Sequence, residues 1–88
     1  MSSIERLYVT AQNSPNNFSF NELCTLVEGV GYKLDRQKGS HCIYKHPLIH
    51  DRYDAMVNIQ NVHGKAKSEQ VKKVIELIEK YNLLERGR

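Results

Sequence analysis

The sequence predicts an α+β fold in which a helix, a three-stranded antiparallel sheet and a second helix follow one another, with a short extra helix in front. Two helical segments each carry a single apolar stripe. Three short β-type runs lie between them and are joined by brief, turn-forming connections. The chain has 88 residues, which is enough for one domain with one modest core.

The short extra helix is predicted over residues 3–12, because apolar residues recur there at helical spacing and Ser3 is placed to cap it. Residues 13–17 are rich in turn formers and interrupt the helix. We expect this first segment either to pack on the core or to form an oligomer contact. The chain is therefore divided into an N-terminal appendage, the domain and a frayed tail, at residues 1–17, 18–84 and 85–88.

The helix predicted over residues 18–30 has the clearest signal. Ser19 and Glu22 form a capping box, in which each side chain accepts a hydrogen bond from the other residue's backbone N–H. Gly31 stands where a residue in the left-handed conformation commonly ends a helix. Cys24 lies on the apolar stripe, so we expect its thiol in the core.

The three strands are predicted over residues 32–36, 40–46 and 55–60. Gly39 provides the left-handed position in the turn between the first two strands. Residues 47–54 form a polar loop before the third strand.

A second basic loop is predicted over residues 61–67, after which Ser68 caps a final helix at 69–81 and Asn82 ends it. Each of the two longer helices has one apolar stripe, so both must cover the same face of the sheet. The other face is left to solvent or to a ligand. This is the plan of a double-stranded-RNA-binding-domain-like (dsRBD-like) fold, which by itself does not give a function.

Alternation along the second strand predicts which side chains reach the uncovered face. His41, Ile43 and Lys45 share one face, whereas Cys42 and Tyr44 share the other. Because a lysine is more stable in water, we place Lys45 on the open face, and His41 then lies on the same face. On the same argument Cys42 points away from His41, which disfavours a metal site on this strand.

Positive charge is concentrated in the middle of the chain. Residues 32–67 hold seven Lys/Arg, three acidic residues and all four histidines, whereas the rest of the chain holds six Lys/Arg and seven acidic residues. This distribution favours an anionic partner such as RNA or DNA. The alternative is a solvated basic face with no ligand.

The two cysteines form no CxxC motif, no apolar run approaches the length of a membrane span, and the first residues lack the apolar core of a signal peptide. We therefore expect a cytoplasmic protein with reduced thiols.

Three segments together resemble the HicA family of bacterial toxins, the mRNA interferases of HicA–HicB toxin–antitoxin pairs. Residues 30–32 close the helix predicted over residues 18–30, residues 36–46 contain the tripeptide Gly-Ser-His, and residues 63–65 precede the last helix. The resemblance covers about residues 18–84. Many family members carry a proline at the second loop, but residues 59–62 of this chain read Ile-Gln-Asn-Val.

The resemblance implies a dsRBD-like fold and cleavage of RNA without a metal, so no cofactor is expected. The histidine of the Gly-Ser-His motif is the family's catalytic residue, and that position here is His41. It also implies two partners, RNA (mRNA) and a cognate HicB-like antitoxin that occludes this face. We expect the chain itself to be a monomer or a weak homo-oligomer with no membrane partner.

Metal-free cleavage needs a base for the ribose 2′-OH, an acid for the leaving 5′-oxygen and cations for the phosphate charge. We hypothesise that His41 is the general base or acid. His46 and His63 are candidates for the second proton transfer, and water is the alternative. The candidate phosphate-binding residues are Arg36, Lys38, Gly39, Ser40, Lys45, Lys65 and Lys67. Two other function classes stay open, namely a non-catalytic double-stranded RNA-binding module and a protein-interaction subunit.

Overall fold

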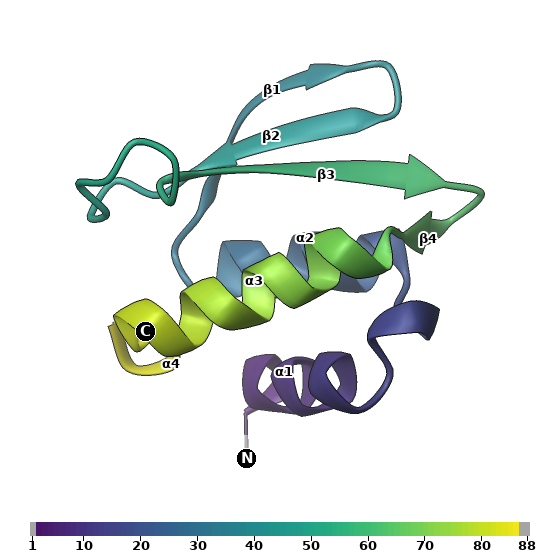
Figure 1. Ribbon diagram of the computed structural model, residues 1–88, viewed down its shortest axis with the longest axis horizontal. Helices are drawn as coiled ribbons and strands as arrows, with labels where there is room; N and C mark the ends of the chain where they lie inside the picture. Colours follow the sequence, from purple (N-terminus) through teal and green to yellow (C-terminus); the bar gives the residue numbers. More distant parts are fainter. Residues whose placement is uncertain (1, 87–88) are drawn as a thin grey trace.

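Two helices cover one face of a four-stranded antiparallel sheet, and a third helix packs on their outer side (Figure 1). The structure is a computed structural model that describes residues 2–86. Its elements in chain order are α1 (Ser3–Asn13), the 3₁₀ helix η1 (Pro15–Asn17), α2 (Phe20–Gly29), β1 (Lys33–Lys38), β2 (His41–Lys45), β3 (Met56–Val62), β4 (Lys65–Ala66), α3 (Ser68–Tyr81) and α4 (Leu83–Arg86).

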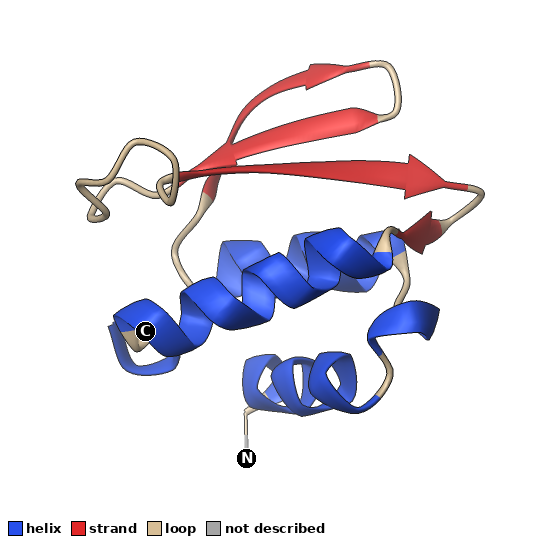
Figure 2. Cartoon of the chain, viewed as in Figure 1, coloured by secondary structure: helices blue, strands red, loops and turns tan. Residues whose placement is uncertain are grey.

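The sheet order is β1-β2-β3-β4, and each neighbouring pair is antiparallel. Helices α2 and α3 both contact β3, so that helices and strands form separate layers (Figure 2). The other face of β1–β3 carries no helix. This arrangement confirms the predicted α+β, dsRBD-like fold.

The sheet has four strands where three were predicted. The predicted basic loop at 61–67 is the end of β3, a two-residue turn and β4. His63 and Gly64 both have positive φ, at 53° and 86°, as a tight hairpin turn requires. The Asn61 side chain accepts a hydrogen bond from Gly64 N at 2.7 Å and holds the turn. A two-residue strand is too short to show alternation, which is why the sequence did not predict it.

Helix α2 begins as predicted. Glu22 N donates to Ser19 Oγ at 3.0 Å, and Ser19 N donates to the Glu22 carboxylate at 3.3 Å. Gly31 has a φ of 107° just after the helix ends. A side chain at Gly31 would also meet His46, because a Cβ there would lie 2.6 Å from His46 Nε2.

Two other caps differ from the prediction by one residue. Ser2, not Ser3, accepts from Glu5 N and caps α1. At α3 the N-cap position belongs to Lys67, which makes no side-chain cap, and Ser68 is the first helical residue. The N-cap of α3 lies one residue earlier than predicted because Lys67 has an extended backbone while its carbonyl already accepts from two helical N–H groups.

Helix α1 packs on α2 and α3, and Ala11 is fully buried in that contact. Gly29 in α2 admits the side chain of Ile4, which would collide with any Cβ at that position. At the other end, Asn82 ends α3 in the left-handed conformation as predicted, with a φ of 53°. Helix α4 then buries Leu83 and continues to Arg86. The last two residues of the predicted frayed tail lie outside the described residues.

The loop between β2 and β3 is tied to the end of α3 by a carboxylate. Asp54 is 7% exposed and accepts from Lys80 Nζ at 2.9 Å and from Tyr81 Oη at 2.6 Å. Its backbone carbonyl accepts from Tyr32 Oη at 2.7 Å. The hydrogen bonds from Tyr81 and Lys80 hold the pKa of Asp54 below its ordinary value.

Among the helices of residues 2–86, none is both long enough and apolar enough to cross a lipid bilayer.

Candidate functional site

The open face of the sheet carries His41 and a group of cations. In β2, Cys42 and Tyr44 are 6% and 3% exposed and pack toward the helices. His41 and Lys45 therefore lie on the opposite, open face, as the alternation predicted.

Strand pairing adds residues of β1 to this face. Lys38 lies opposite His41, Arg36 opposite Ile43, and Lys33 opposite Lys45. Side chains of directly paired residues point to the same side of a sheet. The open face therefore gathers one histidine and four Lys/Arg side chains, which we call the basic face: Lys33, Arg36, Lys38, His41 and Lys45.

The charge of the basic face is only weakly neutralised. Asp35 is the one acidic residue within β1, β2 and β3. It lies 3.9 Å from Arg36 and 3.7 Å from Lys45, in pairs whose cations are more than half exposed. Exposed ion pairs of this kind are weak. The face is therefore electrostatically suited to a polyanion.

The His41 ring is oriented by β3. His41 pairs with Gln60, so Asn58, which precedes Gln60 by two residues, is the diagonal neighbour of His41 on the same face. Asn58 Oδ1 lies 3.0 Å from His41 Nδ1. Because this oxygen only accepts, the neutral ring carries its proton on Nδ1. Among the described residues, His41 Nε2 has no hydrogen-bond partner and keeps a free lone pair.

The turn before His41 leaves room for a close approach. Gly39 has a φ of 56°, and a Cβ placed there would have no neighbour within 4 Å. A phosphate can therefore reach the backbone of this turn without meeting a side chain. The next residue, Ser40, is exposed, and its carbonyl accepts from Asn61 N at 2.9 Å, which links the turn to β3.

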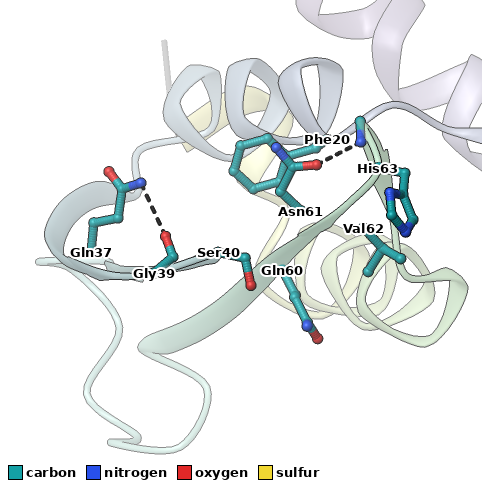
Figure 3. Close-up of a pocket in the computed structure, with 9 residues that line it drawn as sticks. Phe20, Gln37, Gly39, Ser40, Gln60, Asn61, Val62 and His63 are labelled. Carbon is teal, nitrogen blue, oxygen red and sulfur yellow. Dashed lines mark hydrogen bonds between the residues drawn. The ribbon is translucent and has the colours of Figure 1, made fainter.

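A hollow of about 540 Å³ lies beside this turn, between the β1–β2 and β3–β4 connections (Figure 3). Phe20 and Asn61 lie at one side of the view, whereas Gln60 points the opposite way, toward the open face. The hollow is lined by Phe20, Gln37, Gly39, Ser40, Gln60, Asn61, Val62, His63 and Gly64.

The structure separates the remaining predicted cations from His41. Lys65 belongs to β4, two strands away from β2, and its ammonium donates to Asn17 Oδ1 at 3.0 Å. Lys67 follows β4 at the start of α3. Arg36, Lys38 and Lys45 are thus brought together with His41, whereas Lys65 and Lys67 lie at the far edge of the sheet.

The two other candidate histidines have different surroundings. His46 is 4% exposed, its Nε2 lies 3.0 Å from Val30 O, and its Nδ1 accepts from Leu48 N at 3.1 Å. Both ring nitrogens are therefore engaged inside the protein. His63 is exposed in the β3–β4 turn and lines the hollow described above.

Two residues of this face were missed at the sequence level. Asn58 belongs to the third predicted strand and Lys33 to the basic middle segment, but neither is connected with His41 by the sequence alone. Neither has a local motif. Both become recognisable once the pairing of β2 with β1 and β3 is known.

Comparison with known proteins gives one match. A family model described as the HicA toxin of bacterial toxin–antitoxin matches residues 20–80, which run from the start of α2 to the last turn of α3. No curated protein and no solved structure is significantly similar to the chain.

Proposed function

We propose, because the chain belongs to the HicA toxin family, that it is a metal-independent endoribonuclease that cleaves mRNA with His41 as its general acid or base. The observation that carries this proposal is the state of the His41 ring. Asn58 holds the proton on Nδ1, and Nε2 is left free on a basic, open face.

The proposed reaction begins at the ribose 2′-OH. His41 Nε2 accepts the proton of that hydroxyl while its oxygen attacks the neighbouring phosphorus. The new bond joins O2′ to phosphorus, the bond from phosphorus to the 5′-oxygen breaks, and a proton is delivered to the leaving oxygen. The products are a 2′,3′-cyclic phosphate and a free 5′-hydroxyl. A positioned histidine contributes about 10²- to 10⁴-fold to such a rate.

The cations of the basic face would stabilise the charge that develops on the phosphate. Lys38 lies directly opposite His41 in the strand pairing, and Gly39 opens the backbone next to it. Arg36 and Lys45 extend the positive charge along the same face. Lys65 and Lys67 are proposed to contact RNA beyond the scissile phosphate.

The second proton transfer is assigned to water, and His63 is the side chain to test against it. His46 is a poor candidate for this proton transfer, because both of its ring nitrogens already have hydrogen-bond partners. A His63→Ala variant that cleaves RNA at the wild-type rate supports water, whereas a loss of about 100-fold or more supports His63.

The family description also names an antitoxin. We propose that the cognate antitoxin inhibits this chain by covering the basic face, since a protein bound there would exclude RNA from His41.

The test is cleavage of single-stranded RNA in EDTA by the wild type, His41→Ala and a matched His50→Ala control, which removes an exposed histidine from the β2–β3 loop. We expect the wild type and His50→Ala to cleave equally and His41→Ala to lose at least about 100-fold. Equal cleavage by His41→Ala would exclude it as the acid–base group.

If no variant cleaves but all bind RNA, the chain is a non-catalytic RNA-binding module. If RNA affinity is absent or barely depends on salt, the protein-interaction subunit is favoured instead.

A further inference from the structure

Tyr53 is the most exposed of the large apolar side chains that the structure describes, at 77%, and it belongs to the loop between β2 and β3. Met56, at the start of β3, is 40% exposed. Together with Arg52 and Asn58 these two residues line a second hollow of about 540 Å³, which we call the Tyr53 hollow. An exposed aromatic ring beside a concave surface is a common feature of binding sites.

The backbone that carries Tyr53 is firmly held. The Asp51 carboxylate accepts from Tyr53 N at 2.9 Å and from Asp54 N at 3.0 Å. Asp54 is in turn bound to Lys80 and Tyr81 of α3. The ring is therefore presented to solvent from an ordered turn, so that little conformational freedom of the backbone is lost when a ligand binds.

The Tyr53 hollow shares a residue with the candidate active site. Asn58 lines the hollow and also accepts the hydrogen bond from His41 Nδ1. Met56 and Asn58 lie on the same face of β3, and residues two apart in a strand are separated by about 7 Å. Met56 is directly opposite Lys45 of the basic face. A ligand in the hollow would thus lie next to the His41 ring and within the positive field.

The side chains that line the hollow favour a nucleobase and its phosphate over other ligands. A tyrosine ring stacks on the flat face of a nucleobase, and an amide such as that of Asn58 donates to and accepts from the base edge. Arg52, whose guanidinium carbon lies 5.6 Å from the centre of the Tyr53 ring, adds a cation for the adjoining phosphate. A purely apolar protein side chain would use the ring but not the amide or the surrounding cations.

We infer that the Tyr53 hollow is a subsite for one unpaired nucleobase of the RNA, stacked on Tyr53 beside the phosphate that faces His41. The inference rests on the proposed ribonuclease function and extends it in two ways. It requires single-stranded RNA at the cleavage position, because a paired base is not free to enter the hollow. It also makes Tyr53 a residue that determines where along the strand cleavage occurs.

The experiment measures binding separately from cleavage. The probe is a short fluorescein-labelled single-stranded RNA with 2′-O-methyl groups, which lacks the attacking hydroxyl, together with copies that lack the base at one position at a time. Affinities are compared for the full-length wild type, Tyr53→Ala and Tyr53→Phe. Leu48→Ala is the matched control, because Leu48 is 62% exposed in the same loop but does not line the hollow.

We expect Tyr53→Ala to bind about 5- to 150-fold more weakly, the range that stacking of one base on an aromatic ring supplies. Tyr53→Phe keeps the ring and should bind within about 2-fold of the wild type. Removing the base at one position should cost the wild type the same factor and cost Tyr53→Ala nothing further.

Unchanged affinity of Tyr53→Ala, with RNA still bound and unmodified RNA still cleaved by the wild type, would overturn the inference and leave the proposed function intact. The tyrosine would then be a protein-contact residue. Failure of the wild type to bind or cleave any RNA would instead contradict the proposed function itself. Equal loss of affinity in Leu48→Ala would also overturn the inference, because the effect would not be specific to the hollow.

Discussion

Two histidines lie at opposite ends of β2, and they differ in burial, in hydrogen bonding and in the side of the sheet on which they lie. His41, the first residue of the strand, is partly exposed on the open face and uses only Nδ1, toward Asn58. His46 follows the strand and is almost completely buried, with both nitrogens bonded and Tyr32 edge-on at 4.9 Å.

The comparison shows that the same side chain is used for two purposes within six residues. His46 is a packing and hydrogen-bonding element, whose Nε2–H satisfies the carbonyl of Val30 at the end of α2. His41 contributes no buried contact of that kind and leaves one nitrogen free. The covered side of the sheet should therefore govern stability, and the open side should govern RNA chemistry.

Among the variants that test this division between stability and RNA chemistry, His46→Ala should have the largest effect. The variant leaves the buried Val30 carbonyl without its donor and opens a cavity next to Tyr32, which we expect to lower the free energy of unfolding by about 2–4 kcal/mol. His41→Ala, the matched histidine, should change it by no more than about 0.5 kcal/mol. Urea unfolding of both variants measures the difference, and equal values would break the comparison.

A second stability effect is expected at Asp54, on the covered side. Hydrogen bonds from Tyr81 and Lys80 lower the pKa of Asp54 in the folded protein, whereas the unfolded chain titrates near the ordinary value of 3.8. The stabilisation is therefore fully present above pH 3.8 and is lost as the pH falls through the lower pKa of the folded state.

Thermal melts across that acid range should show a steeper loss of stability for the wild type than for Asp54→Asn. Asp35→Asn, which removes a carboxylate from the open face, should keep the wild-type profile. A flat wild-type profile would contradict the role of Asp54.

On the open side, Asn58→Ala should reduce the rate of RNA cleavage by about 10-fold, because the His41 ring loses the acceptor that fixes its tautomer. The loss in kcat should exceed the loss in affinity for non-cleavable RNA, which reflects only the amide contact of Asn58 with the base in the Tyr53 hollow. Gln60→Ala is the control, since Gln60 is directly opposite His41 in the pairing and its side chain does not hold the ring. Equal effects of the two variants would argue against tautomer control.

The smallest effect concerns a single lysine. Lys38→Gln should weaken RNA binding and reduce the slope of log affinity against log salt by about 0.7, the value for one phosphate contact with a single strand. Lys72→Gln, which removes an exposed lysine from α3 on the covered side, should leave the slope unchanged. A reduced slope in both variants would mean that RNA is not confined to the open face.

Local signals in the sequence were sufficient for part of this structure. The Ser19–Glu22 capping box predicted the start of α2, and alternation along β2 predicted the face on which His41 lies. The partner of His41 was not predictable in the same way. Asn58 is 17 residues away, and only the register of β2 against β3 brings the two together. Alternation within each strand fixes the face of a residue but not which of several same-face residues it pairs with, and the long connection over residues 46–55 sets no register as a tight turn would.

The fourth strand and the burial of His46 have the same explanation. β4 consists of two residues whose pairing is fixed by the turn at His63 and Gly64, and no periodicity exists over so short a span. His46 is recognisable as structural only when the end of α2 is seen beside it. A histidine within a basic segment otherwise resembles a catalytic candidate.

The attachment of Asp54 to α3 has a consequence for the time at which the open face is completed during synthesis. Lys80 and Tyr81 follow Asp54 by 26 and 27 residues. A chain growing on the ribosome therefore makes the sheet and the Tyr53 loop before it makes the side chains that anchor that loop. A chain whose translation stops before residue 80 has the Asp51 turn that carries Tyr53 but lacks the two side chains that bind Asp54, so the loop is attached to α3 only after residues 80 and 81 have been added.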